Sequence, residues 1–118
     1  RTTCSLMTAT FTDIASYGAL IFSATTHHRI ESDADFAADA NDALGRFLHR
    51  DWGETCEEDA ESNQASIAAA EAGSPGGTVM GSYTTRTDTK LWIICSGYGQ
   101  HKLGVDYCYT TVLFPAEY

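Results

Sequence analysis

The chain has 118 residues, with 7 Lys and Arg against 16 Asp and Glu, so its formal net charge is −9. This length predicts one domain over residues 1–118, and the shortage of basic residues excludes direct nucleic-acid binding through a basic patch. No segment reaches transmembrane length and the four cysteines show no C-x-x-C spacing, so we expect a cytoplasmic protein with free thiols and no membrane partner.

The first third of the chain predicts one short strand. Residues 1–18 are rich in Ser and Thr and predict an irregular arm. The apolar run ALIFSA at 19–24 has the length of a strand. The following THHR at 26–29 is polar, and we interpret it as a connection.

A helix is predicted over residues 32–50. Ser32 with Asp35 three residues later resembles a capping box, and Arg50 suits the C-terminal end of the helix dipole. Apolar residues recur at helical spacing and predict the packed face: Phe36, Ala40, Ala43, Leu44, Phe47 and Leu48.

A second helix is predicted over 55–72. Thr55 and Glu58 form a capping box, and Gly73 suits the left-handed position after the helix. The predicted packed stripe is Cys56, Ala60, Asn63, Ile67 and Ala70. Cys56 is therefore expected to point inward.

The last third changes to strand periodicity, with strands predicted at 78–86, 90–96 and 105–114. A hairpin turn at 87–89 joins the first two, and a Gly-rich loop at 97–104 joins the others. Both faces of 90–96 are apolar, with Leu91, Ile93 and Cys95 on one and Trp92 and Ile94 on the other, so this strand should be central. A cross-strand Cys95–Cys108 pair stays open.

The predicted fold class is α+β, with two helices covering one face of an antiparallel sheet of three to four strands. Four residues have predicted structural roles. Trp52 and Gly53 shape the connection between the helices, and Trp92 lies on the central strand. Asn63 should bond backbone or a side chain such as Trp52 or Tyr107, because an unpaired buried amide is costly.

Reactive residue types are present without the spacing that a reaction or a metal requires. The four His and four Cys form no H-x-x-x-H or C-x-x-C pair, so we expect no metal and no cofactor. The acids stand mostly at helix starts, where the dipole favours the ionised form. A small enzyme or redox protein using Cys56, with His49 nearby, or a carboxylate near Trp52, stays the alternative.

Three stretches together resemble a family of short uncharacterised proteins often labelled plasmid-related or phage-related. The first is Asp51-Trp52-Gly53-Glu54 with Glu58-Asp59 and Asn63, the second is the TKLWII segment at 89–94, and the third is TTVLFPAEY at 110–118. The resemblance implies a gene carried by a bacterial mobile element. The family has no established activity that the resemblance could assign to this chain.

The negative charge is concentrated in one part of the chain. Residues 31–61 hold eleven acids against Arg46 and Arg50, which equals the whole net charge of −9. A solvated helical face would explain this acidity by solubility alone. We favour a non-enzymatic module that binds a basic protein surface, as an anti-CRISPR or anti-restriction inhibitor would, competing with nucleic acid. A plasmid-maintenance accessory protein and a homodimer also stay open.

The predicted binding residues of this module are all acidic. They are Asp33, Asp35, Asp39, Asp42, Asp51, Glu54, Glu57, Glu58, Asp59 and Glu61.

Overall fold

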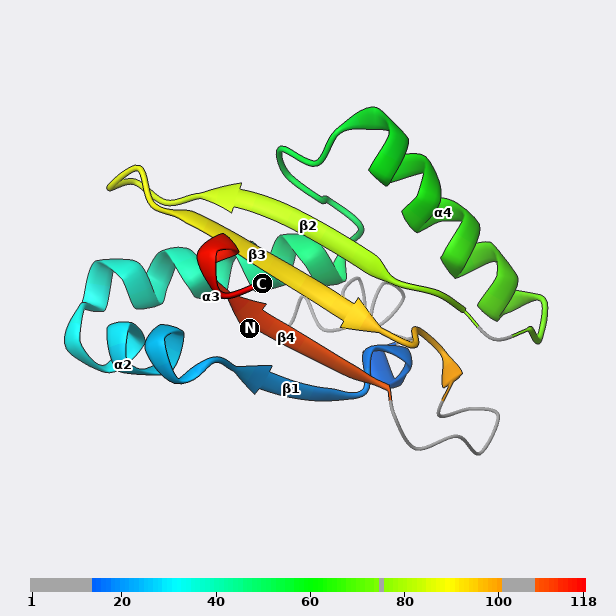
Figure 1. Ribbon diagram of the computed structural model, residues 1–118, viewed down its shortest axis with the longest axis horizontal. Helices are drawn as coiled ribbons and strands as arrows, with labels where there is room; N and C mark the ends of the chain where they lie inside the picture. Colours follow the sequence, from blue (N-terminus) through cyan, green and yellow to red (C-terminus); the bar gives the residue numbers. More distant parts are fainter. Residues whose placement is uncertain (1–13, 75, 101–107) are drawn as a thin grey trace, which may run out of the picture.

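The computed structural model describes residues 14–74, 76–100 and 108–118 (Figure 1). Its elements in chain order are η1 (Ile14–Tyr17), β1 (Ala19–Phe22), α2 (Ala24–Ser32), α3 (Ala34–Leu48), α4 (Glu57–Glu71), β2 (Val79–Thr84), β3 (Lys90–Ser96), β4 (Tyr109–Leu113) and η3 (Pro115–Glu117). The α+β class is confirmed.

The four strands form one sheet in the order β1-β4-β3-β2. β3 is an interior strand as predicted, antiparallel to β2 on one side and to β4 on the other. The sheet is mixed rather than wholly antiparallel, because β1 runs parallel to β4 with Ala19 beside Tyr109. The prediction missed this because three helices and the strands β2 and β3 separate β1 from β4, and strand periodicity does not show in which direction two such distant segments pair.

The helix α3 packs across one face of the sheet and makes the core (Figure 1). The predicted apolar stripe is confirmed, with Phe36, Ala40, Ala43 and Phe47 buried. They meet Leu91, Ile93, Cys95 and Val112 from the sheet. The helix starts later than predicted, since Asp33 is its N-cap and accepts a hydrogen bond from the Phe36 N–H. The predicted Ser32–Asp35 capping box is therefore wrong.

Residues 24–32 form the helix α2 and not the predicted polar connection. Its N-cap is Ser23, whose Oγ accepts a hydrogen bond from the Thr26 N–H at 3.2 Å. The Thr26 side chain is buried, which anchors this otherwise polar helix on the fold. The sequence pattern hid the helix because its apolar content is low.

Part of the predicted N-terminal arm is core. Residues 1–13 lie outside the described ranges, but Tyr17 is buried and its ring contacts those of Phe47 and Tyr98. Tyr98 itself is fully buried, although it stands in the predicted Gly-rich loop. The part of that loop beyond Gln100, and the predicted strand start at 105–107, are outside the described residues.

The helix α4 lies along the outer edge of β2 rather than over a face of the sheet (Figure 1). It begins two residues after the predicted start, with Cys56 as an N-cap that makes no side-chain capping bond. Thr55 is not the cap, because its hydroxyl donates to the Trp52 carbonyl at 2.7 Å. Cys56 is exposed, which corrects the inward orientation predicted for it.

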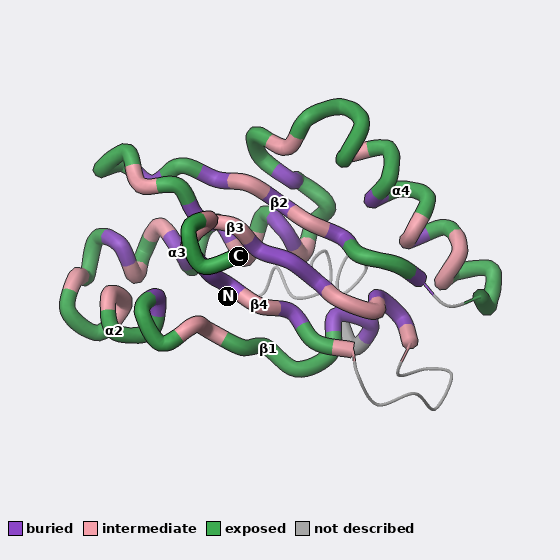
Figure 2. The backbone as a smooth tube through the Cα atoms, viewed as in Figure 1, coloured by how far each residue is buried: buried purple, intermediate pink, exposed green. Residues whose placement is uncertain are grey.

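The face of the sheet opposite α3 carries no α-helix among the described residues (Figures 1 and 2). Trp92 and Ile94 of β3 lie on this open face. The C-terminal segment returns over part of it, with the rings of Trp92 and Tyr118 5.7 Å apart. The Glu117 carboxylate fixes this return by accepting hydrogen bonds from the Phe114 N–H and the Ser23 hydroxyl, both at 2.8 Å.

Candidate functional site

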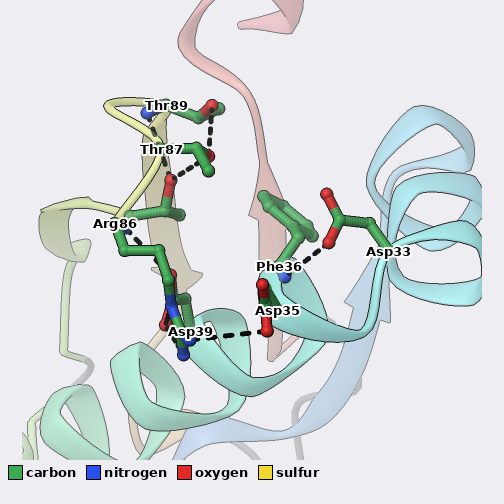
Figure 3. A network of polar contacts seen from close by, with 8 residues as sticks. Asp33, Asp35, Phe36, Asp39, Arg86, Thr87 and Thr89 are labelled. Carbon is green, nitrogen blue, oxygen red and sulfur yellow. Dashed lines mark hydrogen bonds and ion pairs between the residues drawn. The ribbon is translucent and has the colours of Figure 1, made fainter.

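The carboxylates of α3 face Arg86, which follows β2 (Figure 3). Asp39 accepts hydrogen bonds from the Arg86 backbone N–H at 2.9 Å and from its Nη2 at 2.8 Å. Asp35 is 3.4 Å from Nη1 of the same guanidinium. The hydrogen bonds from Arg86 lower the pKa of Asp39, which keeps that carboxylate ionised.

Asp33 has a structural role. Its Oδ1 caps α3 through the Phe36 N–H at 3.1 Å, and its Oδ2 is 3.1 Å from Nε of Arg29 (Figure 3 shows the cap). The capping bond is the main cause that lowers the pKa of Asp33, and Arg29 adds to it. Both contacts occupy the carboxylate, so little of its charge is available to a partner.

Asp51 and Glu54, which flank Trp52, also have cationic partners. Asp51 lies 2.8 Å from Nε of Arg46, and Glu54 lies 2.7 Å from Nζ of Lys90. Arg46 lowers the pKa of Asp51 and Lys90 lowers that of Glu54, in each case mainly through the side-chain hydrogen bond. A general acid near Trp52 would need the opposite shift.

The other five predicted binding acids make no ion pair within the described part of the chain. They are Asp42 on α3 and Glu57, Glu58, Asp59 and Glu61 on α4. The four on α4 are exposed. Glu57 and Glu61 are four residues apart and Glu58 and Glu61 are three apart, so these three project from one helix face. We call Glu57, Glu58 and Glu61 the α4 acidic patch.

The acids on α3 also border a small polar cavity of about 80 Å³ between α3 and β2. Asp39, Asp42, Arg46 and Tyr83 are among its lining residues. The Tyr83 hydroxyl donates to the Asp51 carbonyl at 2.8 Å, and burial raises the pKa of Tyr83. This phenol is therefore a fixed neutral donor that supports the helix connection.

Trp52, Gly53 and Asn63 seal the outer edge of β2. Asn63 is buried, and its amide accepts from the Met80 N–H at 2.9 Å and donates to the Met80 carbonyl at 2.8 Å. The next outward residue, Ser82, donates its N–H to the Trp52 carbonyl at 3.1 Å and accepts from the Glu54 N–H at 2.7 Å. Residues 52–54 thus run beside β2 like a short extra strand.

Gly53 and Trp52 fit this edge for different reasons. Gly53 has a φ of +66°, and a Cβ there would overlap the Ser82 carbonyl oxygen. The exposed fraction of Trp52 is 8%, and its buried indole N–H has no hydrogen-bond partner among the described residues. Its bulk packs into the core cluster, whereas its polar atom adds nothing to the seal. Trp92 lies apart from both, on the open face.

The reactive residues do not assemble into one centre in the described ranges. Nδ1 of His49 is 2.7 Å from the Gly45 carbonyl oxygen, so that ring faces its own helix end and not Cys56. Cys95 and Cys108 are free thiols whose Sγ atoms approach the Tyr17 and Ser16 carbonyls. No three His, Cys, Asp or Glu side chains of residues 14–74, 76–100 and 108–118 gather as metal ligands.

No family model matches the chain, and neither the curated proteins nor the solved structures contain a match. None of the helices in the described ranges combines the length and apolar character of a bilayer-spanning segment.

Proposed function

We propose that this protein is a binding module that recognises a basic protein surface through the α4 acidic patch. The observation that carries the proposal is the contrast between two groups of acids. Asp33, Asp35, Asp39, Asp51 and Glu54 are held by cations of the same chain, whereas Glu57, Glu58 and Glu61 have no such partner among the described residues.

The charge pattern of α4 supports recognition rather than helix stability. Acids at the first turn are favourable beside the helix dipole, but like charges three and four residues apart repel each other. α4 contains no Lys or Arg that would offset this repulsion. A Lys or Arg pair of a partner would remove this repulsion, and the binding would weaken as salt increases.

The concrete form that we favour is an inhibitor of a bacterial defence nuclease, acting in the cytoplasm of the host cell. Such an enzyme holds nucleic-acid phosphates with Lys and Arg, and carboxylates can compete for the same side chains. The resemblance of the 51–63, 89–94 and 110–118 segments to plasmid-related and phage-related proteins supports this setting. A plasmid-maintenance protein would use the same chemistry on another basic partner.

The test is a pull-down of purified Cas and restriction complexes at low and high salt. We expect the wild-type chain to bind one of them at low salt, and the triple variant Glu57→Gln/Glu58→Gln/Glu61→Gln to lose that binding. The matched control removes three charges elsewhere, with Glu31→Gln/Glu71→Gln/Asp88→Asn. Equal loss in both variants would show a general charge effect and reject the patch.

One observation favours the redox alternative. Cys56 is exposed at the N-cap of α4, so its thiol is accessible to a soluble oxidant. With dilute hydrogen peroxide as the oxidant, a redox role predicts a Cys56 sulfenic acid that dimedone traps and that Cys56→Ser abolishes. Trapping no faster than on an unfolded peptide of the same sequence would remove this alternative.

A further inference from the structure

The two edges of the sheet differ in their hydrogen bonding, and the difference points to a second interaction surface. The β2 edge is sealed by Asn63 and residues 52–54. Among the described strands β1 pairs with β4 alone, and Figure 2 shows that most of β1 is exposed. An unpaired edge strand is a ready template for another strand unless charge, Pro or a bulge protects it. The ALIF sequence of β1 has no charged residue and no Pro, and only its short length limits such pairing.

Two backbone hydrogen bonds between β1 and the β4 segment show which backbone groups of β1 point away from β4. Ala19 N–H donates to the Cys108 carbonyl and Ser23 N–H to the Val112 carbonyl, so the odd-numbered residues face β4. The N–H and C=O groups of Leu20 and Phe22 therefore point outward. Neither residue has a backbone partner on that side among the described residues.

The core is also incomplete under β1. A single helix is about 10 Å wide, whereas four strands span roughly 15–19 Å, so α3 does not cover the whole sheet. Two apolar hollows remain, of about 150 Å³ beside Leu20 and Leu48 and of about 170 Å³ beside Phe22 and Ile30. Both are bounded by Leu44 of α3. Apolar side chains next to Leu20 and Phe22 would extend the core here.

The charge distribution identifies the occupant. Two copies of a chain with a net charge of −9 repel each other wherever their acids meet. Residues 14–29, which contain η1, β1 and most of α2, include no Asp or Glu and one cation, Arg29. Glu117 reaches the end of β1, where its carboxylate accepts a hydrogen bond from the Ser23 hydroxyl, but residues 19–22 themselves carry no acid. The β1 strand is therefore a surface where a second copy meets few opposing acids. It also presents the extended, apolar backbone that this pairing needs.

We propose that the protein forms a homodimer in which the β1 strands of two copies pair antiparallel about a two-fold axis at Ile21. In this register Leu20 of each copy stands opposite Phe22 of the other, and their outward N–H and C=O groups form four hydrogen bonds. The two Ile21 side chains meet on the open face, where Cβ atoms of opposed residues are about 4.5–5.5 Å apart. Leu20 and Phe22 of each copy lie beside the hollows of the other.

This arrangement joins the two sheets into one of eight strands, with α3 of both copies on the same face. The alternative, in which the open faces of two copies stack on each other, would use Tyr109 and Trp92 as well as Ile21. The two arrangements therefore differ at Tyr109, which lies on β4 away from the edge and is 40% exposed. The paired segment is short, so we expect a dissociation constant in the micromolar range.

The test is sedimentation equilibrium of the full chain from about 1 µM to about 300 µM. The expected mass rises with concentration from 12.8 kDa toward twice that value. Ile21→Lys places two cations opposite each other, and Leu20→Pro removes an N–H that only the dimer uses, so each should abolish the rise. Tyr109→Lys is the matched control and should leave the dimer intact. Circular dichroism confirms that all variants stay folded.

Amide hydrogen exchange at Leu20 and Phe22 tests the same pairing in the wild-type chain. At high concentration we expect slow exchange at Leu20 and Phe22, and fast exchange at both amides in Ile21→Lys. A chain that stays monomeric through the concentration range overturns the proposal. It is equally overturned if Ile21→Lys still dimerises, if Tyr109→Lys abolishes the dimer, or if Leu20 and Phe22 exchange fast in the dimer.

Discussion

Replacing Asn63 by Leu should open the sealed β2 edge from the helix side. Leu has the same branched arrangement of side-chain heavy atoms as Asn and is somewhat larger, so the change removes hydrogen bonds without creating a cavity. The Met80 N–H loses its partner at 2.9 Å, and the Met80 carbonyl keeps only a 3.5 Å contact with the Thr55 hydroxyl. A buried donor or acceptor without a partner costs about 1–3 kcal/mol. The Met80 N–H would have no partner and the Met80 carbonyl only a weak one, so the free energy of unfolding should fall by about 2–4 kcal/mol.

This loss is large for a domain of this size. Domains unfold with about 5–15 kcal/mol, and each kcal/mol lowers the midpoint temperature by about 3–6 °C at this chain length. Urea unfolding followed by circular dichroism measures the change directly. Gln64→Leu is the control, because Gln64 is the exposed neighbour on α4 and should alter stability by less than about 0.5 kcal/mol. A loss below about 1 kcal/mol for Asn63→Leu would refute the sealing role.

Asn63→Asp separates the two hydrogen bonds. An ionised Asp still accepts from the Met80 N–H but cannot donate to the Met80 carbonyl, which it would repel. Burial and this carbonyl would raise the pKa of the new carboxyl in the folded state above its value in the unfolded chain. The deficit relative to wild type should therefore be largest near pH 7 and shrink as pH falls through that raised pKa, where protonation restores a donor. A deficit independent of pH would contradict this assignment.

The same edge can be opened from the loop side with Gly53→Ala. A φ of +66° costs an L-residue about 1–2 kcal/mol, and overlap of the new Cβ with the Ser82 carbonyl adds to that cost. Gly45→Ala is the matched control. Gly45 lies within α3 with nothing within 4 Å of the Cβ position, so this change should stabilise the fold by about 0.5–1 kcal/mol. Equal effects of the two substitutions would argue against a strained close approach at Gly53.

Three other predictions concern single groups. Iodoacetamide at pH 8 should alkylate exposed Cys56 and leave Cys95 unmodified in the folded chain, since burial raises the pKa of Cys95 to about 12; peptide mass spectrometry resolves the two sites. Arg86→Gln should lower stability at neutral pH. The pKa of Asp39 is lowered in the folded chain from its ordinary value of 3.8, so the ion pair stabilises the fold at pH values above 3.8. This stabilisation is lost as the pH falls through the folded-state pKa. The free energies of unfolding of wild type and variant, measured with urea, should therefore converge in acid. Trp52→Phe should lower the free energy of unfolding by less than about 2 kcal/mol in the same assay, because the indole N–H has no partner among the described residues. A larger loss would contradict an unbonded indole N–H.

The ion-pair partners of the acidic residues could not be predicted from the sequence. The sequence places ten acids between Asp33 and Glu61, but it does not show which of them face a cation. Arg86 is 47 residues from Asp39, and Lys90 is 36 residues from Glu54. These pairs form because β2 and β3 return beside α3 and the 52–54 segment. Only the chain fold could divide the acids into neutralised ones and the α4 acidic patch.

Local chemistry, in contrast, determined by itself that α3 and α4 are helices and that β3 is an interior strand, although it did not reveal α2. The 3.6-residue spacing of Phe36, Ala40 and Phe47 produces the buried face of α3 in any context that offers a core. The two apolar faces of 90–96 likewise required an interior strand. Tertiary structure decided what sequence periodicity cannot carry: the parallel return of β1 beside β4, the position of α4 at an edge rather than over a face, and the open groups of Leu20 and Phe22. Each of these depends on which distant backbone segment supplies a hydrogen-bond partner, and that choice is made only when the whole sheet assembles.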